Sequence, residues 1–529
     1  MTLRPAGRIY AHGGGTVKHS DSPENRPTMT NTHTLSRRDF LQASGAAALS
    51  LAASGRGNAL KEPIKRPNIV FVLADQLRYQ SCGYAGDANA RTPRFDAFAR
   101  EGASFGNAVS GHPVCSAFRA SLFTGKYTTS TGMVINELRI NPNHECIGHV
   151  LTRGGYETAY IGKWHLWANQ LGNHDDPKNS FTPPGPYRLG FDGFWASYGF
   201  HHEYYRGYYH TNGPEKIPAE GYEPDFQTSL AIEQIKKLSR GDKPFALFLS
   251  VGTPHDPWSP SNVPKDYYAR FAGVDFNLPP NYKPDNDPYS DAWGRFKDAR
   301  NRKQIPQWMR VYYAMIANLD WNFGRLLAAI DAAGIRDDTI VVFTSDHGEM
   351  LGAQGRRAKN IFYEEAARVP FLMRWPQRIP AGRVSDACLN TPDIMPTLVS
   401  MAGLPVPSKA EGMDLSHCAY GQPGPEPEAA LLMNTGACAL WEDGYEWRAL
   451  RDKRHTYAVY RRDGRELLFD NAADPNQMRD LASASGSEEV LRRFRELLKK
   501  QMARIGDTNE ASTWYRDNWT KDRVITYAG

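Results

Sequence analysis

The most chemically suggestive feature of this 529-residue sequence is a cysteine that is followed four positions later by an arginine. The segment Cys115-Ser-Ala-Phe-Arg119 opens a helical pattern that runs to Gly125, a residue suited to end a helix. A side chain at a helix N-terminus faces unpaired N–H groups and the positive end of the helix dipole, which favour an anionic group or transition state. A thiolate at Cys115 would fit this environment. However, no Cys-His-Asn protease pattern accompanies it, and carboxylates elsewhere in the sequence indicate a cation instead.

Polar residues of metal-binding or catalytic type lie at the ends of four short apolar runs. The runs cover residues 67–75, 158–161, 245–251 and 339–343, and each indicates a buried parallel strand. The polar residues at or after their ends are Asp75, Gln76, Lys163, His165, His255, Asp346 and His347. Ligands bind at the carboxyl edge of open α/β sheets. Four strands that end in this way therefore predict one site at that edge.

Helical patterns lie between the predicted strands. One begins at Thr92-Pro93, in N-cap and N1 positions, and others cover residues 229–238 and 311–333. This alternation predicts an α/β fold in which helices sandwich a large, mainly parallel sheet.

The sequence changes character after residue 376, where Pro and Gly become frequent. Residues 447–451 and 456–460 indicate hairpin strands, and residues 487–503 indicate a helix. We therefore expect a smaller C-terminal α+β subdomain that contains an antiparallel sheet. The polar tail from Gly506 is expected to wrap over the surface.

The N-terminal region resembles an export signal. The segment Ser-Arg37-Arg38-Asp-Phe-Leu matches a twin-arginine pattern, and the apolar run over residues 43–53 is too short to span a membrane. A start at Met29 instead of Met1 would put the arginines where such signals carry them. We expect export by the twin-arginine machinery to the periplasm or the outside of a bacterial cell.

These features divide the chain into three expected parts. Residues 1–59 are an N-terminal extension with the signal, residues 60–376 are the catalytic domain, and residues 377–529 hold the end of that domain and the C-terminal subdomain.

The bulk composition is that of a soluble globular protein, with 41% hydrophobic and 23% charged residues. A formal net charge of +5 with scattered basic residues argues against nucleic-acid binding. The six cysteines lack metal-type CxxC spacing. An exported protein could form disulfides, and Cys418 and Cys438 are the closest pairing candidates by position in the sequence. We expect most of the six cysteines to be small buried hydrophobic residues.

The segment Cys115-x-Ala-x-Arg119, followed by Ala-Ser-Leu-Phe-Thr-Gly, resembles the signature of the formylglycine-dependent sulfatases of the alkaline phosphatase superfamily. In that family a formylglycine-generating enzyme oxidises the cysteine. The resemblance covers roughly residues 67–481 and includes Asp75, Ile161-Gly-Lys-Trp-His165, Pro254-His255, Ser345-Asp-His-Gly-Glu349, Lys359, Glu466-Leu-Leu-Phe-Asp470 and Asp474-Pro475. There are two departures: Ala117 replaces the usual Pro of the signature, and Gln76 replaces the second Asp of the usual metal pair.

The resemblance implies a metal site and a set of catalytic residues. One divalent cation, calcium by preference with magnesium or manganese as alternatives, would be bound by Asp75, Gln76, Cys115 as the nucleophile, Asp346 and His347. Arg119 would hold the hydrated formylglycine, and Lys163 and Lys359 would carry positive charge to the sulfate oxygens. His255 would protonate the leaving alcohol, and His165 would take the proton from the second hydroxyl so that sulfate leaves.

Further residues are expected at the substrate or in the scaffold. His201 and His202 lie in an aromatic insertion that we interpret as a wall of the substrate pocket, with a surface loop as the alternative. Arg356 would meet additional acidic groups of a polysaccharide, or be solvated. We interpret His112, which precedes a proline, as structural.

Together these features predict hydrolysis of a sulfate ester on a sulfated small molecule or glycan, with a carbohydrate favoured by export and by the aromatic loops. One alternative is a phosphodiester or phosphonate monoester hydrolase, which shares the fold, the formylglycine and an Asp-His metal pair. A second alternative is a non-catalytic glycan-binding relative in which Cys115 is never converted. Such a relative should have lost several of these groups, yet nearly all are present.

Overall fold

An eight-stranded sheet organises the computed structural model, which describes residues 66–168 and 170–528. The strand order is β10-β2-β9-β8-β1-β7-β3-β4. The four predicted strands are neighbours in it: β8 (Thr339–Ser345), β1 (Asn68–Asp75), β7 (Phe245–Pro254) and β3 (Glu157–Lys163). All three pairings between them are parallel, which confirms the predicted α/β fold. The predicted twin-arginine signal and the Met29 start lie outside the described residues.

The remaining strands complete the two sides of the sheet. β4 (Phe194–Tyr198) continues the parallel arrangement beside β3. On the other side, β9 (Phe371–Arg374) is antiparallel to both β8 and β2 (Ala103–Phe105), and β10 (Arg383–Ser385) pairs parallel with β2. The sheet is therefore mixed at one side and parallel where the predicted site residues lie.

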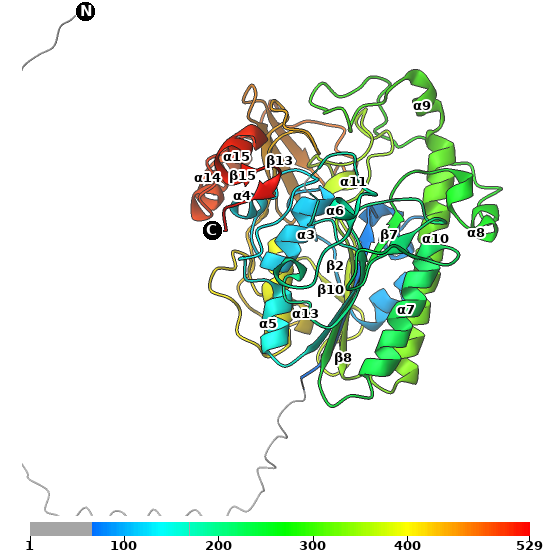
Figure 1. Ribbon diagram of the computed structural model, residues 1–529. Coiled ribbons are helices and arrows are strands. Elements are labelled where there is room, and N and C mark those ends of the chain that lie inside the picture. The colour runs from blue at the N-terminus through cyan, green and yellow to red at the C-terminus, as the bar shows by residue number, and fades with distance from the viewer. Residues whose placement is uncertain (1–65, 169, 529) are drawn as a thin grey trace, which may run out of the picture. The chain divides into compact units, whose positions relative to one another are not determined.

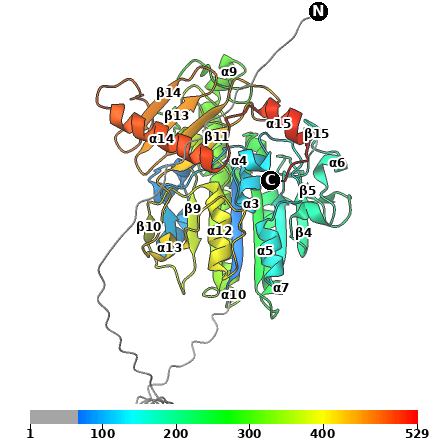
Figure 2. The ribbon, with the colours of Figure 1, turned by 90° about the vertical axis from the view of Figure 1, so that its left-hand side faces the viewer.

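Side chains of β1 alternate between two hydrophobic cores, as expected for a strand buried on both faces. Ile69, Phe71 and Leu73 belong to one core, and Val70 and Val72 belong to the other. Each core lies between the sheet and a helical layer, so that the sheet is covered on both faces (Figures 1 and 2).

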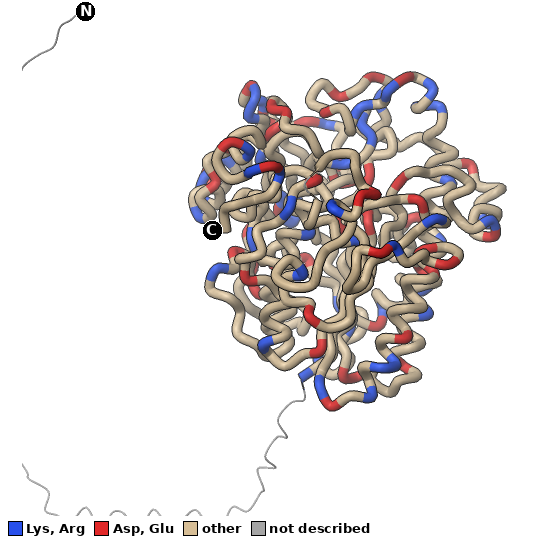
Figure 3. The backbone as a smooth tube through the Cα atoms, viewed as in Figure 1, with Lys and Arg blue, Asp and Glu red and all other residues tan. Residues whose placement is uncertain are grey.

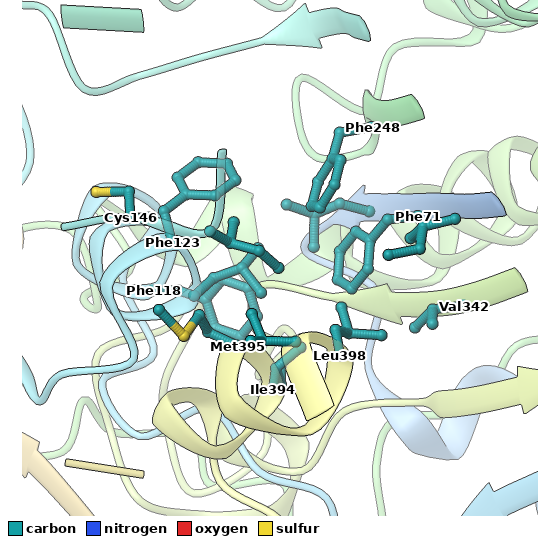
Figure 4. Packing of buried hydrophobic residues seen from close by; sticks show 14 of the residues in the cluster. Phe71, Phe118, Phe123, Cys146, Phe248, Val342, Ile394, Met395 and Leu398 are labelled. Carbon is teal, nitrogen blue, oxygen red and sulfur yellow. The ribbon is translucent and has the colours of Figure 1, made fainter. Parts of the chain in front are cut away.

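Two sets of helices cover these faces. The first face packs against α3 (Cys115–Thr124), α5 (Ile147–Arg153) and α12 (Thr391–Met401). Figure 4 shows side chains of α3 and α12 meeting Phe71 and Phe248 of the sheet. The second face packs against α2 (Pro93–Glu101), α7 (Glu223–Leu238) and α10 (Ile305–Ala332). Shorter helices are α4 (Thr128–Thr131), α6 (Pro177–Ser180), α8 (Lys265–Ala269), α9 (Ala299–Lys303), α11 (Glu364–Ala367) and α13 (Ser416–Tyr420).

The helix predicted from Thr92-Pro93 is confirmed, but two others begin earlier than their apolar periodicity indicates. α7 begins at Glu223 instead of residue 229, with Pro224 in the first turn. α10 begins at Ile305 instead of residue 311, again with a proline in the first turn. Proline is favoured there because the first turn needs no intrahelical N–H bond.

A second, antiparallel sheet forms the predicted C-terminal subdomain. Its strands are β11 (Ala430–Asn434), β12 (Trp447–Arg451), β13 (His455–Tyr460) and β14 (Glu466–Asp470), in sequence order. The predicted helix is α14 (Glu488–Arg504), whose apolar face packs against this sheet. The opposite face packs against the segment around Phe362.

The segment after Gly506 contains more regular structure than its polarity suggests. It forms α15 (Ser512–Trp519) and a short hairpin of β15 (Thr520–Lys521) and β16 (Val524–Ile525). The backbone N–H of Arg139 donates to the Arg523 carbonyl (2.9 Å), so this segment lies against the loop that follows α4.

Charge and cysteine usage agree with the sequence analysis. Basic and acidic residues are interspersed along the described chain (Figure 3). All six cysteines are free and buried, so Cys418 and Cys438 do not form a disulfide. None of the described helices is both long and apolar enough to cross a membrane. Residues 66–168 and 170–528 form one compact unit.

Candidate active site

The carboxyl ends of the central parallel strands meet at one edge of the sheet. Asp75 is the last residue of β1, and Asp346 directly follows β8. Lys163 ends β3, and His255 directly follows β7. Residues that are far apart in sequence are thereby brought together.

Four potential metal ligands converge at this edge. One donor atom from each of Asp75, Cys115, Asp346 and His347 lies within 4.8 Å of the others, and all four residues are buried. The Cys115 Sγ is 3.1 Å from His347 Nε2 and 3.8 Å from Asp75 Oδ1. Two carboxylates and an imidazole around one point form a donor set that fits a divalent cation. The cluster can therefore hold a metal ion.

His347 directs an unprotonated nitrogen into the cluster. Its Nδ1 donates to the Gly348 carbonyl (3.0 Å), so Nε2 carries the lone pair. Burial, assisted by Lys359 and opposed by Asp346, lowers the pKa of His347 to about 4. Neutral imidazole is the form that binds metal ions.

Cys115 is the first residue of α3, as predicted, and the helix ends at Gly125 in the left-handed conformation (φ 64°). The Gly125 N–H donates to the Ser121 carbonyl (2.9 Å). Burial, and after it the Asp75 carboxylate, raises the pKa of the Cys115 thiol to about 11. The thiol is therefore protonated at neutral pH, which disfavours plain thiolate chemistry.

Gln76 uses both ends of its side-chain amide. Its Nε2 donates to Glu349 Oε2 (2.8 Å), and its Oε1 accepts from Lys359 Nζ (2.9 Å). Its backbone N–H donates to Asp346 Oδ1 (3.0 Å), and its φ of 70° is unusual for a residue with a side chain. An amide satisfies both neighbours, whereas an aspartate could only accept. This explains the departure at position 76.

Two buried cations surround the Asp75 carboxylate. The Arg119 guanidinium lies 3.6 Å from Asp75 and 3.3 Å from Asp346, and it also donates to the Lys163 carbonyl (2.8 Å) and the Ser250 hydroxyl (2.6 Å). The Lys163 ammonium forms an ion pair with Asp75. Burial alone would raise the pKa of Asp75, but Lys163 and the other cations hold it well below its usual range.

A third cation, Lys359, reaches the cluster from the loop after β8. Its Nζ lies 3.3 Å from Cys115 Sγ and 2.9 Å from His255 Nε2. The His255 Nδ1 donates to the Asp256 carbonyl (2.8 Å), so its Nε2 accepts from Lys359. Burial, and after it Lys359, holds the pKa of His255 well below its usual value. The His202 ring stacks on His255 at 3.8 Å.

His165 follows β3 and lies against the buried carboxylate of Glu137. Its Nε2 is 3.1 Å from Glu137 Oε1, and its ring stacks on Phe200 at 4.6 Å. Lys163 Nζ lies over the same Phe200 ring at 4.6 Å. Burial, and after it Lys163, holds the pKa of His165 well below its usual value.

A cavity of about 310 Å³ opens onto these groups. Residues from separate segments line it, among them Glu137, His174, Phe200, His202, His255, Trp293, Arg357, Lys359 and Cys438. Trp293 is unusual because 52% of its surface is exposed. The cavity therefore extends from His255 and Lys359 to the exposed ring of Trp293.

Two residues that we expected at the substrate do not line this cavity. His201 packs on Tyr208 and lies 3.4 Å from Glu223, on the side of its loop away from the cavity. Arg356 is 1% exposed and forms an ion pair with Asp287 (2.8 Å). Their sequence neighbours His202 and Arg357 line the cavity instead.

His112 is buried, and burial with Arg448 lowers its pKa to about 3.

The sequence analysis gave no role to Glu137, His174 or Trp293. None of them follows a predicted strand or belongs to the family motif, so their spacing carried no signal. Only the aromatic type of Trp293 could have suggested a sugar-binding role.

An α/β sheet with a buried metal-type cluster and three cations at its carboxyl edge defines a hydrolase of anionic esters. The model of the sulfatase family matches residues 67–404, and the chain belongs to that family of sulfuric ester hydrolases. A model described as the C-terminal part of N-sulphoglucosamine sulphohydrolase matches residues 352–504.

Several proteins are similar to this chain over most of their length. The Ulvan-active sulfatase of Formosa agariphila is 37% identical over 86% of this chain and 84% of its own. The Endo-4-O-sulfatase of Bacteroides thetaiotaomicron is 29% identical over 88% and 96%, respectively. Among solved structures, a Bacteroides fragilis protein assigned to the sulfatases superimposes with a TM-score of 0.73 at 30% identity, covering 87% of this chain and 100% of that one.

Proposed function

We propose that this sulfatase hydrolyses a sulfate ester on a carbohydrate or polysaccharide fragment, with a formylglycine made from Cys115 and a bound divalent cation. The observation that carries the proposal is the position of Cys115. Its Sγ lies inside the buried ligand cluster and 3.3 Å from the Lys359 ammonium. The relatives that act on ulvan and as an endo-4-O-sulfatase support a glycan substrate.

The residues of the cluster fit the proposed groups. Asp75, Asp346 and His347 would hold the cation. The Gln76 side-chain oxygen lies 2.9 Å from the Lys359 ammonium, which contacts Cys115. Oxygen-rich ligands favour calcium, and the imidazole leaves magnesium and manganese open. When both groups are present, formylglycine supplies a hydrated aldehyde as nucleophile, and the cation lowers the pKa of its hydroxyl and polarises a sulfate oxygen.

The protein neutralises the substrate before any bond changes. A sulfate ester is an anion, so attack at sulfur needs positive charge around the non-bridging oxygens. Lys359 stands at the cavity wall, and Lys163 lies buried beside the Asp75 carboxylate. Both ammonium groups are fixed by partners, which limits the reorganisation needed when substrate binds.

His255 is proposed to protonate the leaving oxygen of the alcohol. Its ring lines the cavity, its Nδ1 is anchored on the Asp256 carbonyl, and its Nε2 faces Lys359. In the free site, burial and after it the Lys359 ammonium hold the pKa of His255 well below its usual value and favour the neutral ring. An anionic ester between the two groups would favour the imidazolium, which can then give a proton to the alkoxide. His165, on the opposite side, is proposed to accept a proton from the nucleophile.

The rim of the cavity supports a sugar substrate. Trp293 offers a half-exposed ring on which a pyranose can pack, and Arg357 offers a guanidinium for a second anionic group. We expect Trp293→Ala to raise KM at least about fivefold for a sulfated oligosaccharide but not for a small aryl sulfate. Equal KM values in wild type and variant for the oligosaccharide would contradict a sugar-stacking role.

The nucleophile is tested by peptide mass spectrometry across Cys115 after co-expression with a formylglycine-generating enzyme. We expect the aldehyde in place of the thiol. Cys115→Ala should abolish turnover with little change in the thermal unfolding midpoint. An unmodified thiol in fully active protein would overturn the proposal.

The phosphonate monoester hydrolase of Agrobacterium radiobacter shares the fold, with a TM-score of 0.62 at 24% identity. Matched aryl sulfate and aryl phosphonate esters separate the two activities. We expect kcat/KM to favour the sulfate, and a clear preference for the phosphonate would overturn the substrate class.

Maturation and location are part of the proposal. We infer export to the periplasm or beyond through the twin-arginine machinery, on the basis of the Arg37-Arg38 pattern. Cell fractionation of the wild type and of an Arg37→Lys, Arg38→Lys double variant tests this. The variant should accumulate inside the cytoplasm.

A further inference from the structure

Glu137 is a buried carboxylate that lies between two histidines beside the catalytic cluster. Its Oε1 is 3.1 Å from His165 Nε2, and its Oε2 is 3.6 Å from His174 Nδ1. Only 3% of the Glu137 side chain is exposed, whereas 31% of the His174 side chain is exposed. Within the described part of the chain, neither Glu137 Oε2 nor His174 Nδ1 has a hydrogen-bond partner, so their 3.6 Å contact is electrostatic. The carboxylate therefore connects the buried His165 to the cavity surface.

The backbone at Glu137 is held in place from a distant part of the chain. Glu137 has a φ of 62°, in the left-handed region. Arg523 Nε donates to the Glu137 carbonyl (2.7 Å), and one terminal nitrogen donates to the carbonyls of Asn136 (2.8 Å) and Ala439 (3.2 Å). A residue in such a conformation persists when its surroundings fix it, and such residues cluster at functional sites.

We propose that Glu137 is the positioning residue for His165, and that it selects the tautomer that leaves the His165 Nδ1 lone pair free to accept a proton. The carboxylate accepts from Nε2–H, so the other ring nitrogen is unprotonated. The His165 Nδ1 is buried and has no hydrogen-bond partner among the described residues, as expected for an unprotonated base in the free enzyme. This inference rests on the proposed role of His165 as a base.

The proton balance of the step is simple. The second hydroxyl of the sulfated hydrate would lose its proton to His165 Nδ1, its oxygen would form the aldehyde C=O, and the bond from that carbon to the sulfate oxygen would break so that sulfate leaves. The Nε2–H remains on the ring. The resulting imidazolium is stabilised by the Glu137 carboxylate, and the ring later returns the same proton to solvent. His174 steadies the second carboxylate oxygen from the cavity side.

The charged and titratable groups that face Glu137 are Arg523 and Lys163, the imidazoles of His165 and His174, and the Cys438 thiol. Burial, opposed by the two cations, raises the pKa of Glu137 to about 7. Above that pH the carboxylate is charged and supports the imidazolium. We therefore expect kcat to rise as the pH passes through about 7.

The tautomer is tested without turnover in the Cys115→Ala protein. Histidine-selective ¹⁵N NMR should show His165 with a protonated Nε2 and an unprotonated Nδ1. Adding Glu137→Ala should shift this signal toward a mixture of tautomers. A protonated Nδ1 in the presence of Glu137 would overturn the inference.

Kinetics of the mature enzyme give the second test. Glu137→Gln should lower kcat by about 10- to 100-fold with little change in KM, and the pH limb near 7 should disappear. Glu145→Gln is a matched control, because Glu145 lies in the same region but pairs with Arg153 at the surface. A Glu137→Gln enzyme with the kcat and pH profile of the wild type would overturn the inference.

The variant His165→Asn distinguishes the positioning role of Glu137 from the role of His165 as the base. Full activity of His165→Asn would remove the base itself. A large loss for His165→Asn together with no loss for Glu137→Gln would overturn only the positioning role. Should Glu137→Gln fail to fold, His174→Phe keeps the aromatic ring beside Phe200 and removes the nitrogen, and it should lower kcat about threefold or more. An unchanged kcat for His174→Phe would then count against the inference.

Discussion

At the scale of single residues, the choice of glutamine at position 76 follows from its neighbour Glu349. Glu349 is buried, and burial raises its pKa. It accepts from the Gln76 amide and from the backbone N–H groups of Leu351 (3.0 Å) and Ala358 (2.7 Å). The amide therefore links Lys359, which contacts Cys115, to the Glu349 carboxylate.

This contact predicts the effect of an acidic residue at position 76. Gln76→Glu would bring two carboxylates to about the distance that now separates amide and acid, and buried like charges disfavour each other's ionisation. We expect it to lower kcat about tenfold or more and to reduce the unfolding midpoint. The double variant Gln76→Glu, Glu349→Gln should recover much of both, because it restores one amide and one acid. Additive losses in a double-mutant cycle would contradict this account.

The ligand cluster predicts a link between cation binding and stability. A ligand that binds only the folded state raises the free energy of unfolding by about 2.7 kcal/mol at 100 times its Kd. We expect millimolar calcium to raise the thermal unfolding midpoint of the wild type and EDTA to lower it. Asp346→Asn should remove most of this response, since it weakens one of the buried oxygen ligands. Identical midpoints with calcium and with EDTA would contradict a cation site.

Residue types and order were enough to predict most of the side chains that meet at this edge of the sheet. Asp75, Lys163, His255 and Asp346 stand at strand ends, and a strand end is recognisable from an apolar run alone. Glu137 was not predictable, because its position depends on contacts with Arg523 that no local pattern encodes.

At the scale of elements, the nucleophile position depends on one short helix. α3 places Cys115 at its first turn and ends at Gly125, whose left-handed φ of 64° favours glycine. A Cβ at Gly125 would also lie 3.3 Å from Ala410 Cβ and 3.4 Å from Met395 Sδ.

Gly125→Ala is therefore expected to destabilise the protein by about 1 kcal/mol or slightly more. Chemical denaturation at equilibrium measures the change, provided that unfolding is reversible. Gly241→Ala is the matched control, because its added Cβ would make only one contact, at 3.4 Å. A smaller loss at Gly125 than at Gly241 would show that the helix end is not under this constraint.

Helix positions were predicted better at their apolar centres than at their first turns. The apolar periodicity located α7 and α10, but their first turns contain few apolar residues and begin with proline instead. Signals from the first turn, namely Glu223-Pro224 and Ile305-Pro306, would have moved both predicted starts upstream.

At the scale of the whole molecule, buried acids set how stability depends on pH. Glu223 lies at the start of α7, where it accepts from Gln227 Nε2 (3.0 Å). Burial raises its pKa to about 8. The folded state therefore holds a proton that the unfolded state has lost, and stability declines as pH rises from about 4.5 to about 8.

Glu223→Gln should flatten this decline, because the amide does not titrate. The measurement is the free energy of unfolding at several pH values between 5 and 8, compared with the wild type. Glu220→Gln, on the exposed loop just before α7, provides the control and should leave the pH dependence unchanged. A wild-type slope in the Glu223 variant would show that other acids dominate.

The architecture at this scale was predictable from strand and helix alternation, and the antiparallel C-terminal sheet was too. The path of the last segment was not. It is polar and lacks a long periodic pattern, and its position depends on contacts such as those of Arg523 with carbonyl groups near the cavity.

The contacts of Arg523 can form only late in the synthesis of the chain. Glu137 and Arg523 are 386 positions apart, so the ribosome must add nearly four hundred residues before the loop beside His165 gains its clamp. A nascent chain, or one released early by a premature stop codon, can contain Cys115 and every strand-end ligand and still have an unfinished catalytic wall. Truncation before residue 523 therefore leaves the Glu137 carbonyl without its bond from Arg523.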